Sequence, residues 1–329
     1  MEQLEPAWRQ DFEPGLVSVI IPTYNRAGVV RHAIDSALAQ SWPKVQVIVV
    51  NDGSKDDTIS QLNSIRDIIV IHQANQGVAA ARTAGLRAAS GEYIASLDSD
   101  DVWRPNYLST LIPLMLEHGC QAGIAAREKR ISGRLTPVRA TPIELKYVPS
   151  SEPFILLNSE EVRSLGMASV LLPNPGVVFH RQIVEPWPVG LRTIDDIGQH
   201  MSVILRHSPR AVLVPSPLWE VSPAGQDEES IVGRNQRSDL GWRTYRELTS
   251  IENEWRLHLT PQERRTFARK RADWLSGDSA YPLSLKGRII PALHAYGVAL
   301  GTDLNVRRVR DLAAGFVRAL RARTLSHSS

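Results

Sequence analysis

The chain has 329 residues and a formal net charge of +3; 43% of its residues are hydrophobic and 22% are charged. This balance is typical of a folded globular protein of about two domains, and it excludes a disordered or a collagen-like chain. Cys120 is the only cysteine, which excludes an internal disulfide and a cysteine-rich zinc site, and we expect its side chain to be buried.

Short apolar runs alternate with segments of helical spacing up to residue 126. The runs are rich in β-branched residues and predict strands at 16–22, 45–50, 68–72, 93–98 and 120–126. The segments between them predict helices at 27–41, 56–65, 77–89 and 105–118. This alternation predicts an α/β fold with a Rossmann-like, mostly parallel sheet that is covered by helices on both faces.

The second half of the chain is less regular. Residues 127–153 are basic and rich in proline, and we expect a loop or an edge hairpin there. Strand character returns at 171–180, a helix is expected at 194–206, and a short strand at 212–214. The chain beyond residue 224 is expected to be helical, with helices at 242–257, 261–275 and 303–322.

Four polar clusters follow predicted strands. They are Pro22–Arg26, Asn51–Ser54, Asn75–Gly77 and Asp98–Asp101. Ligands of open α/β sheets bind beyond the carboxyl ends of the parallel strands, so we expect these clusters to share one rim. Taken alone, the turn at Asn51–Ser54 is better explained by structure than by function, because Asp and Ser cap helices and Gly adopts a positive φ.

The cluster at 98–101 is harder to explain by capping. Three carboxylates in four residues repel one another and raise each other's pKa unless a positive charge lies among them. Mg²⁺ or Mn²⁺ would remove the repulsion, because these ions prefer oxygen ligands and often bind one or two carboxylates together with substrate phosphates. The cluster therefore predicts a divalent metal that carries an anionic diphosphate.

Other common motifs are absent from the sequence. No GxGxxG follows the first predicted strand, and no GxxxxGK[ST] or GxSxG occurs, so dinucleotide dehydrogenases, P-loop ATPases and α/β-hydrolases lose their main support. The histidines are scattered, and a zinc site at His200 and His207 is not favoured.

Four segments closely resemble the family 2 glycosyltransferases of the GT-A fold. They are VSVIIPTYNR, NDGSKDDT, NQGVAAARTAGL, and SGEYIASLDSDD followed by WRP. The resemblance is strong over about residues 16–120 and fades toward residue 220. It implies a metal-dependent, inverting transfer of a sugar from a nucleoside-diphosphate sugar, with UDP as the expected nucleotide, to an acceptor hydroxyl.

The resemblance also assigns residues to the donor. Thr23, Tyr24 and Asn25 look like the nucleoside-contacting loop, and Asp52 matches the aspartate that hydrogen-bonds the base, although Asn51 stands where many relatives have a second Asp. Asp98 and Asp100 match the DxD motif, with Asp101 as a replacement in the metal shell. The full set implied for the nucleotide sugar is Pro22, Thr23, Tyr24, Asn25, Arg26, Asp52, Asn75, Gly77, Arg82, Asp98, Ser99 and Asp100.

An inverting transfer needs a base for the acceptor hydroxyl. The family places it in an acidic pair before a helix, and Asp195 and Asp196 are the nearest match. Relatives often have an arginine seven residues after the first acid, whereas Arg206 lies eleven after Asp195. Two alternatives stay open: a helix cap at this pair, or His200 as the base. Trp187 and Trp219 are candidates for stacking on a sugar, with buried packing as the alternative.

The domain organisation follows from these assignments. We expect an N-terminal extension at 1–15, a GT-A domain at 16–225 with a nucleotide half at 16–126 and an acceptor half at 127–225, and a helical extension at 226–329. The last 44 residues hold eight basic and two acidic residues. The basic final helix is expected either to present a solvated face over a packed core or to lie on an anionic membrane.

The sequence shows no signal peptide and no membrane span, so a cytoplasmic protein is expected, with peripheral contact at the inner membrane face as an extension of that idea. The acceptor would be a sugar, a lipid-linked sugar or another hydroxyl compound. No nucleic-acid partner is expected. The rival functions are a sugar nucleotidyltransferase, which would release pyrophosphate, and a silent nucleotide-sugar-binding protein.

Overall fold

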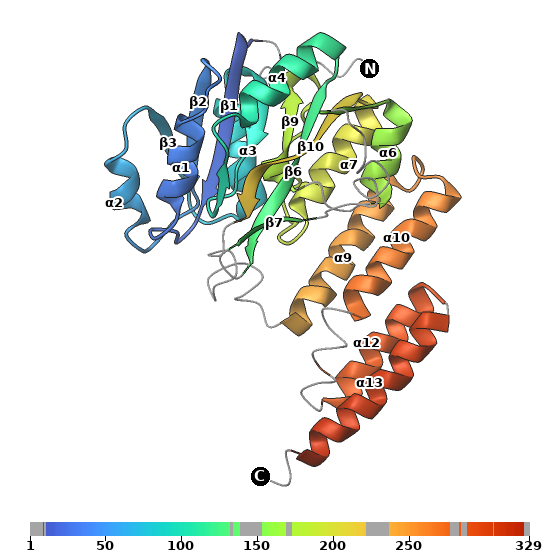
Figure 1. The fold of residues 1–329 in the computed structure, drawn as a ribbon. Coiled ribbons are helices and arrows are strands. Elements are labelled where there is room, and N and C mark those ends of the chain that lie inside the picture. The colour runs from blue at the N-terminus through green and yellow to red at the C-terminus, as the bar shows by residue number, and fades with distance from the viewer. Residues whose placement is uncertain are drawn as a thin grey trace. The chain divides into compact units, whose positions relative to one another are not determined.

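The computed structural model describes Arg9 and residues 11–131, 134–138, 153–168, 173–221, 237–276, 283, 288–304 and 306–325. The chain divides into two compact units, Met1–Gly225 and Gln226–Ser329, and each is described by itself (Figure 1).

In its described residues, the first unit contains a ten-stranded sheet with the strand order β3-β2-β1-β4-β9-β6-β10-β5, in which β7 pairs with β6 and β8 with β10. The strands are β1 Glu13–Thr23, β2 Val45–Asn51, β3 Ile68–His72, β4 Gly91–Ser96, β5 Asp101–Trp103, β6 Ala122–Ile131, β7 Arg134–Val138, β8 Ile155–Leu157, β9 Val177–His180 and β10 Ala211–Val221. Strands β1 to β4 pair in parallel, so their carboxyl ends meet at one edge.

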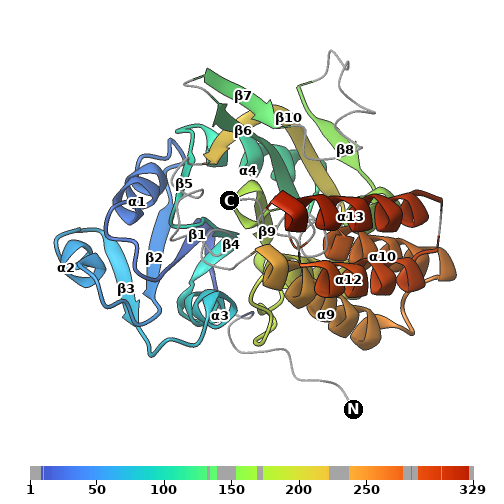
Figure 2. The same cartoon turned by 90° about the horizontal axis from the view of Figure 1, so that it is seen from below.

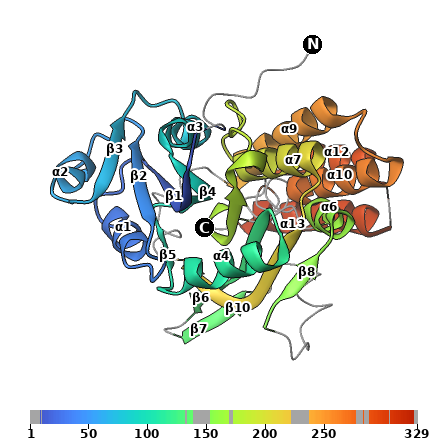
Figure 3. The ribbon, with the colours of Figure 1, turned by 90° about the horizontal axis from the view of Figure 1, so that it is seen from above.

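Helices cover both faces of this sheet. They are α1 Val30–Leu38, α2 Thr58–Asn63, α3 Val78–Ala88, α4 Tyr107–His118, α6 Ser159–Ala168 and α7 Asp195–His207, with short 3₁₀ turns η2 Asn174–Gly176 and η3 Arg181–Ile183. Side chains alternate along β1: Val19 and Ile21 pack with α1 and α4, whereas Ile20 packs with α3, α6 and α7. Figure 2 shows α1 and α3 on opposite sides of β1 and β2, and Figure 3 shows α3 and α7 together on one side.

Helix α3 lies unusually close to β1. A Cβ atom built at Gly85 would lie 2.4 Å from Cγ2 of Ile20 and 3.3 Å from Val50, which is too near for any real side chain. The missing side chain therefore lets α3 approach the strands directly. This close approach fixes the position of Arg82, which lies on the same helix near the edge of the sheet.

The predicted α/β fold with helices on both faces is confirmed. The largest differences come from pairings between distant segments. Strand β5 begins directly at the acidic bend because Trp103 pairs with Trp219 of β10, a contact that no local pattern reveals. The paired strands β6 and β7 confirm an edge hairpin over the described part of 127–153; residues 139–152 lie outside the described chain.

Three further elements of the second half differ from expectation. Helix α6 and strand β8 were not predicted, and β10 is much longer than the predicted strand at 212–214. Pro215 and Pro217 interrupt the apolar pattern of β10, but its pairing with β6 continues through register shifts on both sides of Pro217. Tertiary pairing therefore extends the strand past a sequence that is locally unfavourable.

The second unit is helical in its described parts. Its helices are α9 Arg237–Trp255, α10 Pro261–Trp274, α12 Ile289–Thr302 and α13 Val306–Leu325. Thr260 and Glu263 form a capping box that starts α10, and Tyr296 of α12 belongs to the core of this unit. Helix α12 lies in the part of the chain that is predicted to be helical, but it is not among the three predicted helices, because it is apolar around much of its circumference and carries Pro291 in its first turn.

One basic residue of the final helix points inward. Arg308 of α13 is buried and forms ion pairs with Asp273 at 2.5 Å, Asp303 at 3.8 Å and Asp311 at 3.9 Å. This arginine of the basic final helix therefore forms ion pairs inside the second unit and does not face solvent. Among the described residues, no helix is long and apolar enough to cross a membrane.

Candidate functional site

The loop after β1 and the loop after β2 are joined by hydrogen bonds that backbone amides donate. The amide of Asn25 donates to Oγ of Ser54 at 2.9 Å, and the amide of Lys55 donates to Oδ1 of Asn25 at 2.8 Å. Asn25 adopts a left-handed conformation with φ of 51°, which asparagine tolerates better than most residues. The amide of Arg26 donates to Oγ1 of Thr58 at 2.9 Å. The loop after β1 is therefore held in place by the loop after β2 and the start of α2.

Asp52 organises the third loop. Its Oδ1 accepts from Nε2 of Gln73 at 2.7 Å and from the amide of Gln76 at 2.8 Å. Its Oδ2 accepts from the amide of Gly77 at 2.8 Å, and the residue is buried. Three donors on one buried carboxylate make charge-assisted hydrogen bonds that fix the loop before α3. Asp52, which the resemblance assigns to the base of the nucleotide, thus also holds the loop after β3 in place.

Gly53 packs directly against this third loop. Its φ is +76°, and a Cβ atom there would lie 2.9 Å from the backbone nitrogen of Asn75. We expect Gly53→Ala to lower the free energy of unfolding by about 1–2 kcal/mol, because the left-handed conformation penalises a side chain. Gly28→Ala is the matched control, since nothing lies within 4 Å of that position. Chemical denaturation of both variants checks this; equal stability of the two would contradict it.

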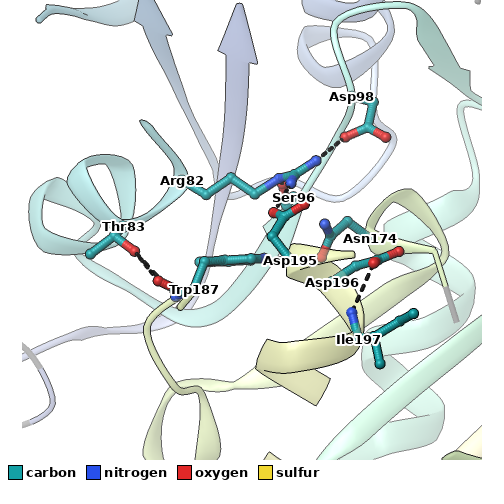
Figure 4. Close-up of polar contacts among 9 residues, drawn as sticks. All are labelled: Arg82, Thr83, Ser96, Asp98, Asn174, Trp187, Asp195, Asp196 and Ile197. Atoms are coloured by element: carbon teal, nitrogen blue, oxygen red, sulfur yellow. Dashed lines mark hydrogen bonds and ion pairs between the residues drawn. The ribbon is translucent and has the colours of Figure 1, made fainter. Parts of the chain in front are cut away.

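Arg82 connects three parts of the site (Figure 4). Its Nε donates to Oγ of Ser96 at 3.1 Å, one terminal nitrogen donates to Asp98, and the other donates to Asp195. The Arg82 side chain is only 5% exposed, while that of Asp98 is 35% exposed. A single buried guanidinium therefore joins the acidic bend after β4 to the first residue of α7.

Burial and these ion pairs shift the pKa values around Arg82. Burial alone would lower the pKa of Arg82, but Asp195 and Asp98 outweigh it and raise the pKa. Burial raises the pKa of Asp195, which Arg82 opposes. Burial and the neighbouring Asp195 raise the pKa of Asp196 to about 7. Asp196 is partly exposed, and its Oδ1 accepts from the amide of Ile197 at 2.8 Å.

The acidic bend is partly neutralised by arginines. Asp98 pairs with Arg82, and Oδ2 of Asp100 lies 3.5 Å from a terminal nitrogen of Arg26. Asp101 is buried at the start of β5, where it pairs with Val221. Within the described part of the chain, no three acidic, histidine or cysteine side chains gather to hold a metal ion. Asp98 and Asp100 are both partly exposed, and their carboxylates are of the kind that Mg²⁺ binds together with substrate oxygens.

The alternative residues near α7 are deeply placed. His200 is buried with its ring 5.3 Å from that of Phe179, and burial together with Arg82 lowers its pKa to about 3. Trp187 and Trp219 are both buried, which agrees with packing and not with an exposed sugar platform. Helix α7 is continuous over thirteen residues, so Asp195 and Arg206, about three turns apart, lie on one face.

The structure brings most of the predicted residues to the same sheet edge. Pro22 and Thr23 are buried at the end of β1, and Ser99 is buried in the acidic bend. Other members are partly or fully exposed along this edge: Tyr24, Asn25, Arg26, Asn75, Gly77, Asp98 and Asp100. Asp195 reaches the edge from α7 through Arg82.

Several residues of the site carried no signal in the sequence. Thr83 exchanges hydrogen bonds with the backbone of Trp187, and Nε1 of Trp187 donates to Oδ1 of Asn174 at 3.2 Å. These pairs join segments far apart in the chain, so only the folded structure identifies them. Ser96 was missed because it is the last residue of a buried strand, where its hydroxyl is not distinguished by spacing.

The chain matches known sequences over its first half. A model of glycosyl transferase family 2 matches residues 18–185. An uncharacterized glycosyltransferase of Nostoc sp., alr2836, is 45% identical over 174 residues, 51% of this chain and 52% of that protein. A protein of Escherichia coli, the UDP-Glc:alpha-D-GlcNAc-diphosphoundecaprenol beta-1,3-glucosyltransferase WfaP, is 40% identical over 103 residues, 30% of this chain and 41% of that protein. The matched stretch thus spans less than two thirds of these relatives.

Solved structures share the fold over nearly the whole chain. S. aureus TarS 1–349 in complex with UDP-GlcNAc has a TM-score of 0.58 at 17% identity, covering 93% of this chain and 92% of that one. The mannosyltransferase PcManGT from Pyrobaculum calidifontis, in complex with GDP-Man and Mn²⁺, has a TM-score of 0.54 at 18% identity, covering 97% and 88%. At such identity these structures show a common architecture, and function has to be argued from the site.

Proposed function

The chain belongs to glycosyl transferase family 2, and we propose that it moves a sugar from a nucleoside-diphosphate sugar to an acceptor hydroxyl with inversion at the transferred carbon. The observation that carries the proposal is the joining of the acidic bend after β4 to Asp195 of α7 by Arg82. Asp98, on the proposed donor side, and Asp195, at the start of α7, are thereby held close to each other. A direct displacement needs the donor and the groups that activate the acceptor to be held close together in this way.

The donor would occupy the rim formed by the loops after β1, β2 and β3. Asp52, which accepts three hydrogen bonds from the loop after β3, would also accept one from the base of the nucleotide. Its carboxylate can accept more than the three bonds that the protein donates. The relative WfaP uses UDP-Glc by its name, and TarS was solved with UDP-GlcNAc, so we propose a UDP-linked donor. The residues 16–126 would be the nucleotide half and 127–225 the acceptor half.

A divalent ion would bind Asp98 and Asp100 together with the diphosphate. When bound, it would neutralise the charge that develops on the leaving diphosphate. Arg26 and Arg82 already pair with these two carboxylates in the protein, which orients both side chains at the bend. Asp101, buried in β5, is a less favourable third ligand.

Asp196 is the proposed base. Asp195 is held by a charged hydrogen bond from Arg82, whereas Asp196 is partly exposed and accepts from the amide of Ile197. Its raised pKa suits proton abstraction near neutral pH. His200 is a poor alternative, because a group with a pKa of about 3 has little affinity for a proton.

The transfer rate should depend on pH through Asp196. The base must be ionised, so the turnover number should rise with pH and reach half its maximum near the pKa of about 7. Turnover under saturating donor, measured in steps from pH 5.5 to 8.5, checks this. A rate that is flat or falls across this range would contradict the assignment.

Helix α13 of the second unit is proposed to contact a membrane. Val309, Phe316 and Val317 of α13 are 43% to 50% exposed, and the exposed Arg310 lies among them. An apolar stripe flanked by arginine fits an anionic lipid surface. WfaP acts on a diphosphoundecaprenol-linked sugar by its name, so we propose a lipid-linked acceptor and a location at the inner face of the membrane.

Membrane binding should depend on this stripe. Phe316→Ser combined with Val317→Ser should weaken binding to vesicles containing phosphatidylglycerol by at least about tenfold, because two apolar anchors are lost. Leu257→Ser is the control, since Leu257 is 96% exposed outside α13. Sedimentation with vesicles is the measurement. Vesicle binding by the double variant equal to that of wild type, or no vesicle binding by the intact chain, would refute the proposed membrane contact of α13.

The proposed function is tested by a thermal-shift screen followed by turnover. UDP, GDP, UDP-glucose, UDP-N-acetylglucosamine and GDP-mannose are each offered with and without Mn²⁺, and we expect stabilisation by UDP compounds with the metal. Release of UDP from the stabilising sugar then identifies a transferase. Release of pyrophosphate from UTP and a sugar phosphate would identify a nucleotidyltransferase, and binding without turnover a silent binding protein.

A further inference from the structure

Two neighbouring residues of α3 hold the elements that carry the proposed base (Figure 4). Arg82 donates to Asp195, the first residue of α7. Thr83 Oγ1 accepts from the amide of Trp187 at 3.1 Å and donates to its carbonyl at 3.2 Å. One helix of the nucleotide half therefore fixes both the start of α7 and the segment that leads into it.

The guanidinium of Arg82 is committed to protein partners. Each of its three nitrogens donates to a side-chain oxygen, from Ser96, Asp98 or Asp195, and the side chain is buried. Three of its five N–H donors are used in these bonds, and a nucleotide phosphate would have to share the charge of Arg82 with two carboxylates that already accept from it. The geometry favours a residue that orients other groups over one that binds the donor.

We propose that Arg82 is a positioning residue for proton transfer and not a ligand of the nucleotide, an inference that rests on the proposed function. It clamps the carboxylate of Asp195 against the acidic bend. The next residue, Asp196, is thereby held at the partly exposed start of α7, where it can accept the proton of the acceptor. Arg82 also pairs with Asp98, so the same guanidinium contacts both the acidic bend and the residue before the proposed base.

Lysine cannot replace arginine in this arrangement. The planar fork reaches Ser96, Asp98 and Asp195 at once, whereas an ammonium group is a compact charge on a flexible stem. Arg82→Lys should therefore lower the turnover number by about 100-fold, the cost of a misplaced catalytic group. The affinity for UDP with Mn²⁺ should stay unchanged, because lysine keeps the positive charge beside Asp98 and Arg82 is not proposed to contact the nucleotide.

The pH profile separates positioning from a purely structural role. The charges that face Asp196 are Asp195 and Asp98, which raise its pKa, and Arg82, which lowers it. Arg82→Gln removes the lowering charge, so the pH of half-maximal turnover should move upward. Arg82→Lys keeps a positive charge, so its profile should move less. A variant that was only less stable would leave the profile where it was.

The experiment measures turnover, UDP affinity with Mn²⁺, and the pH profile for wild type, Arg82→Lys and Arg82→Gln, with Arg31→Gln as control. Arg31 forms an exposed pair with Asp35 at 2.8 Å, and its variant should match wild type. If Arg82→Gln fails to fold, Asp195→Asn tests the clamp from its other side, with the same loss of turnover at unchanged affinity. In the Arg82→Lys, Asp195→Asn double variant the losses should be less than multiplicative.

Two results would overturn the inference. Weaker UDP binding by more than about tenfold, with turnover at saturating donor and the pH profile unchanged, would make Arg82 a nucleotide ligand. Wild-type turnover in both Arg82 variants would remove any role. Failure of the wild type to release UDP from every donor sugar is distinct, because it overturns the proposed function and this inference with it.

Discussion

Asp196→Asn should lower the turnover number by about 10³-fold, because the amide cannot take the proton of the acceptor. The affinity for UDP with Mn²⁺ should not change, since Asp196 has no assigned contact to the nucleotide. The shape of the site should also be kept, because the amide oxygen can still accept from the amide of Ile197. Steady-state turnover and titration of UDP are the two measurements.

Asp67→Asn is the matched control for this variant. Asp67 is exposed and has a φ of 63°, a conformation that asparagine adopts readily. The control should equal wild type in both measurements. Full activity of Asp196→Asn would discard Asp196 as the base, and a loss of UDP affinity equal to the loss of turnover would move it to the donor side.

Asp52→Ala should lower both the free energy of unfolding and the affinity for the nucleotide. Its carboxylate accepts from three donors of the third loop, and its removal leaves these partly buried donors without this partner. We expect the free energy of unfolding to fall by about 2–4 kcal/mol. Affinity for UDP should fall by more than about tenfold, or 1.4 kcal/mol, because the loop before α3 is no longer fixed.

The measurement for Asp52 is local as well as global. Hydrogen exchange at the amides of Gln76 and Gly77 should become much faster in Asp52→Ala, alongside a lower denaturation midpoint. Asp57→Ala is the control, because Asp57 lies in the same turn but makes no side-chain capping bond to α2. Unchanged exchange at Gln76 and Gly77 would show that the loop is held by other contacts.

The strands of the nucleotide half were predictable because their pattern is local. The predicted strand at 68–72 and the helix at 77–89 correspond closely to β3 and α3, and their polar ends meet at one rim as parallel pairing requires. The predicted contacts of Asp52 were incomplete for the same reason. A turn pattern describes Asn51–Ser54 well, but Asp52 finds its donors in the following loop.

The charge balance of the site could not be read from spacing. The acidic residues at 98–101 indicated that a positive charge lies among them, and a metal ion was the predicted source of that charge. The structure adds Arg26 and Arg82, of which Arg82 reaches Asp195, 113 positions along the chain. The unpredicted strand β5 has the same origin, because it exists only through its pairing with β10. Long-range contacts therefore decided both differences.

Titration of UDP into the intact chain, once with Mn²⁺ and once with a chelator, tests the central claim most directly. We expect binding with Mn²⁺ and at least about tenfold weaker binding in chelator, since the diphosphate would then face Asp98 and Asp100 without a bridging ion. The Asp100→Ala variant should lose most of this difference. Equal affinity in Mn²⁺ and in chelator, or no binding of UDP in either, would contradict the account.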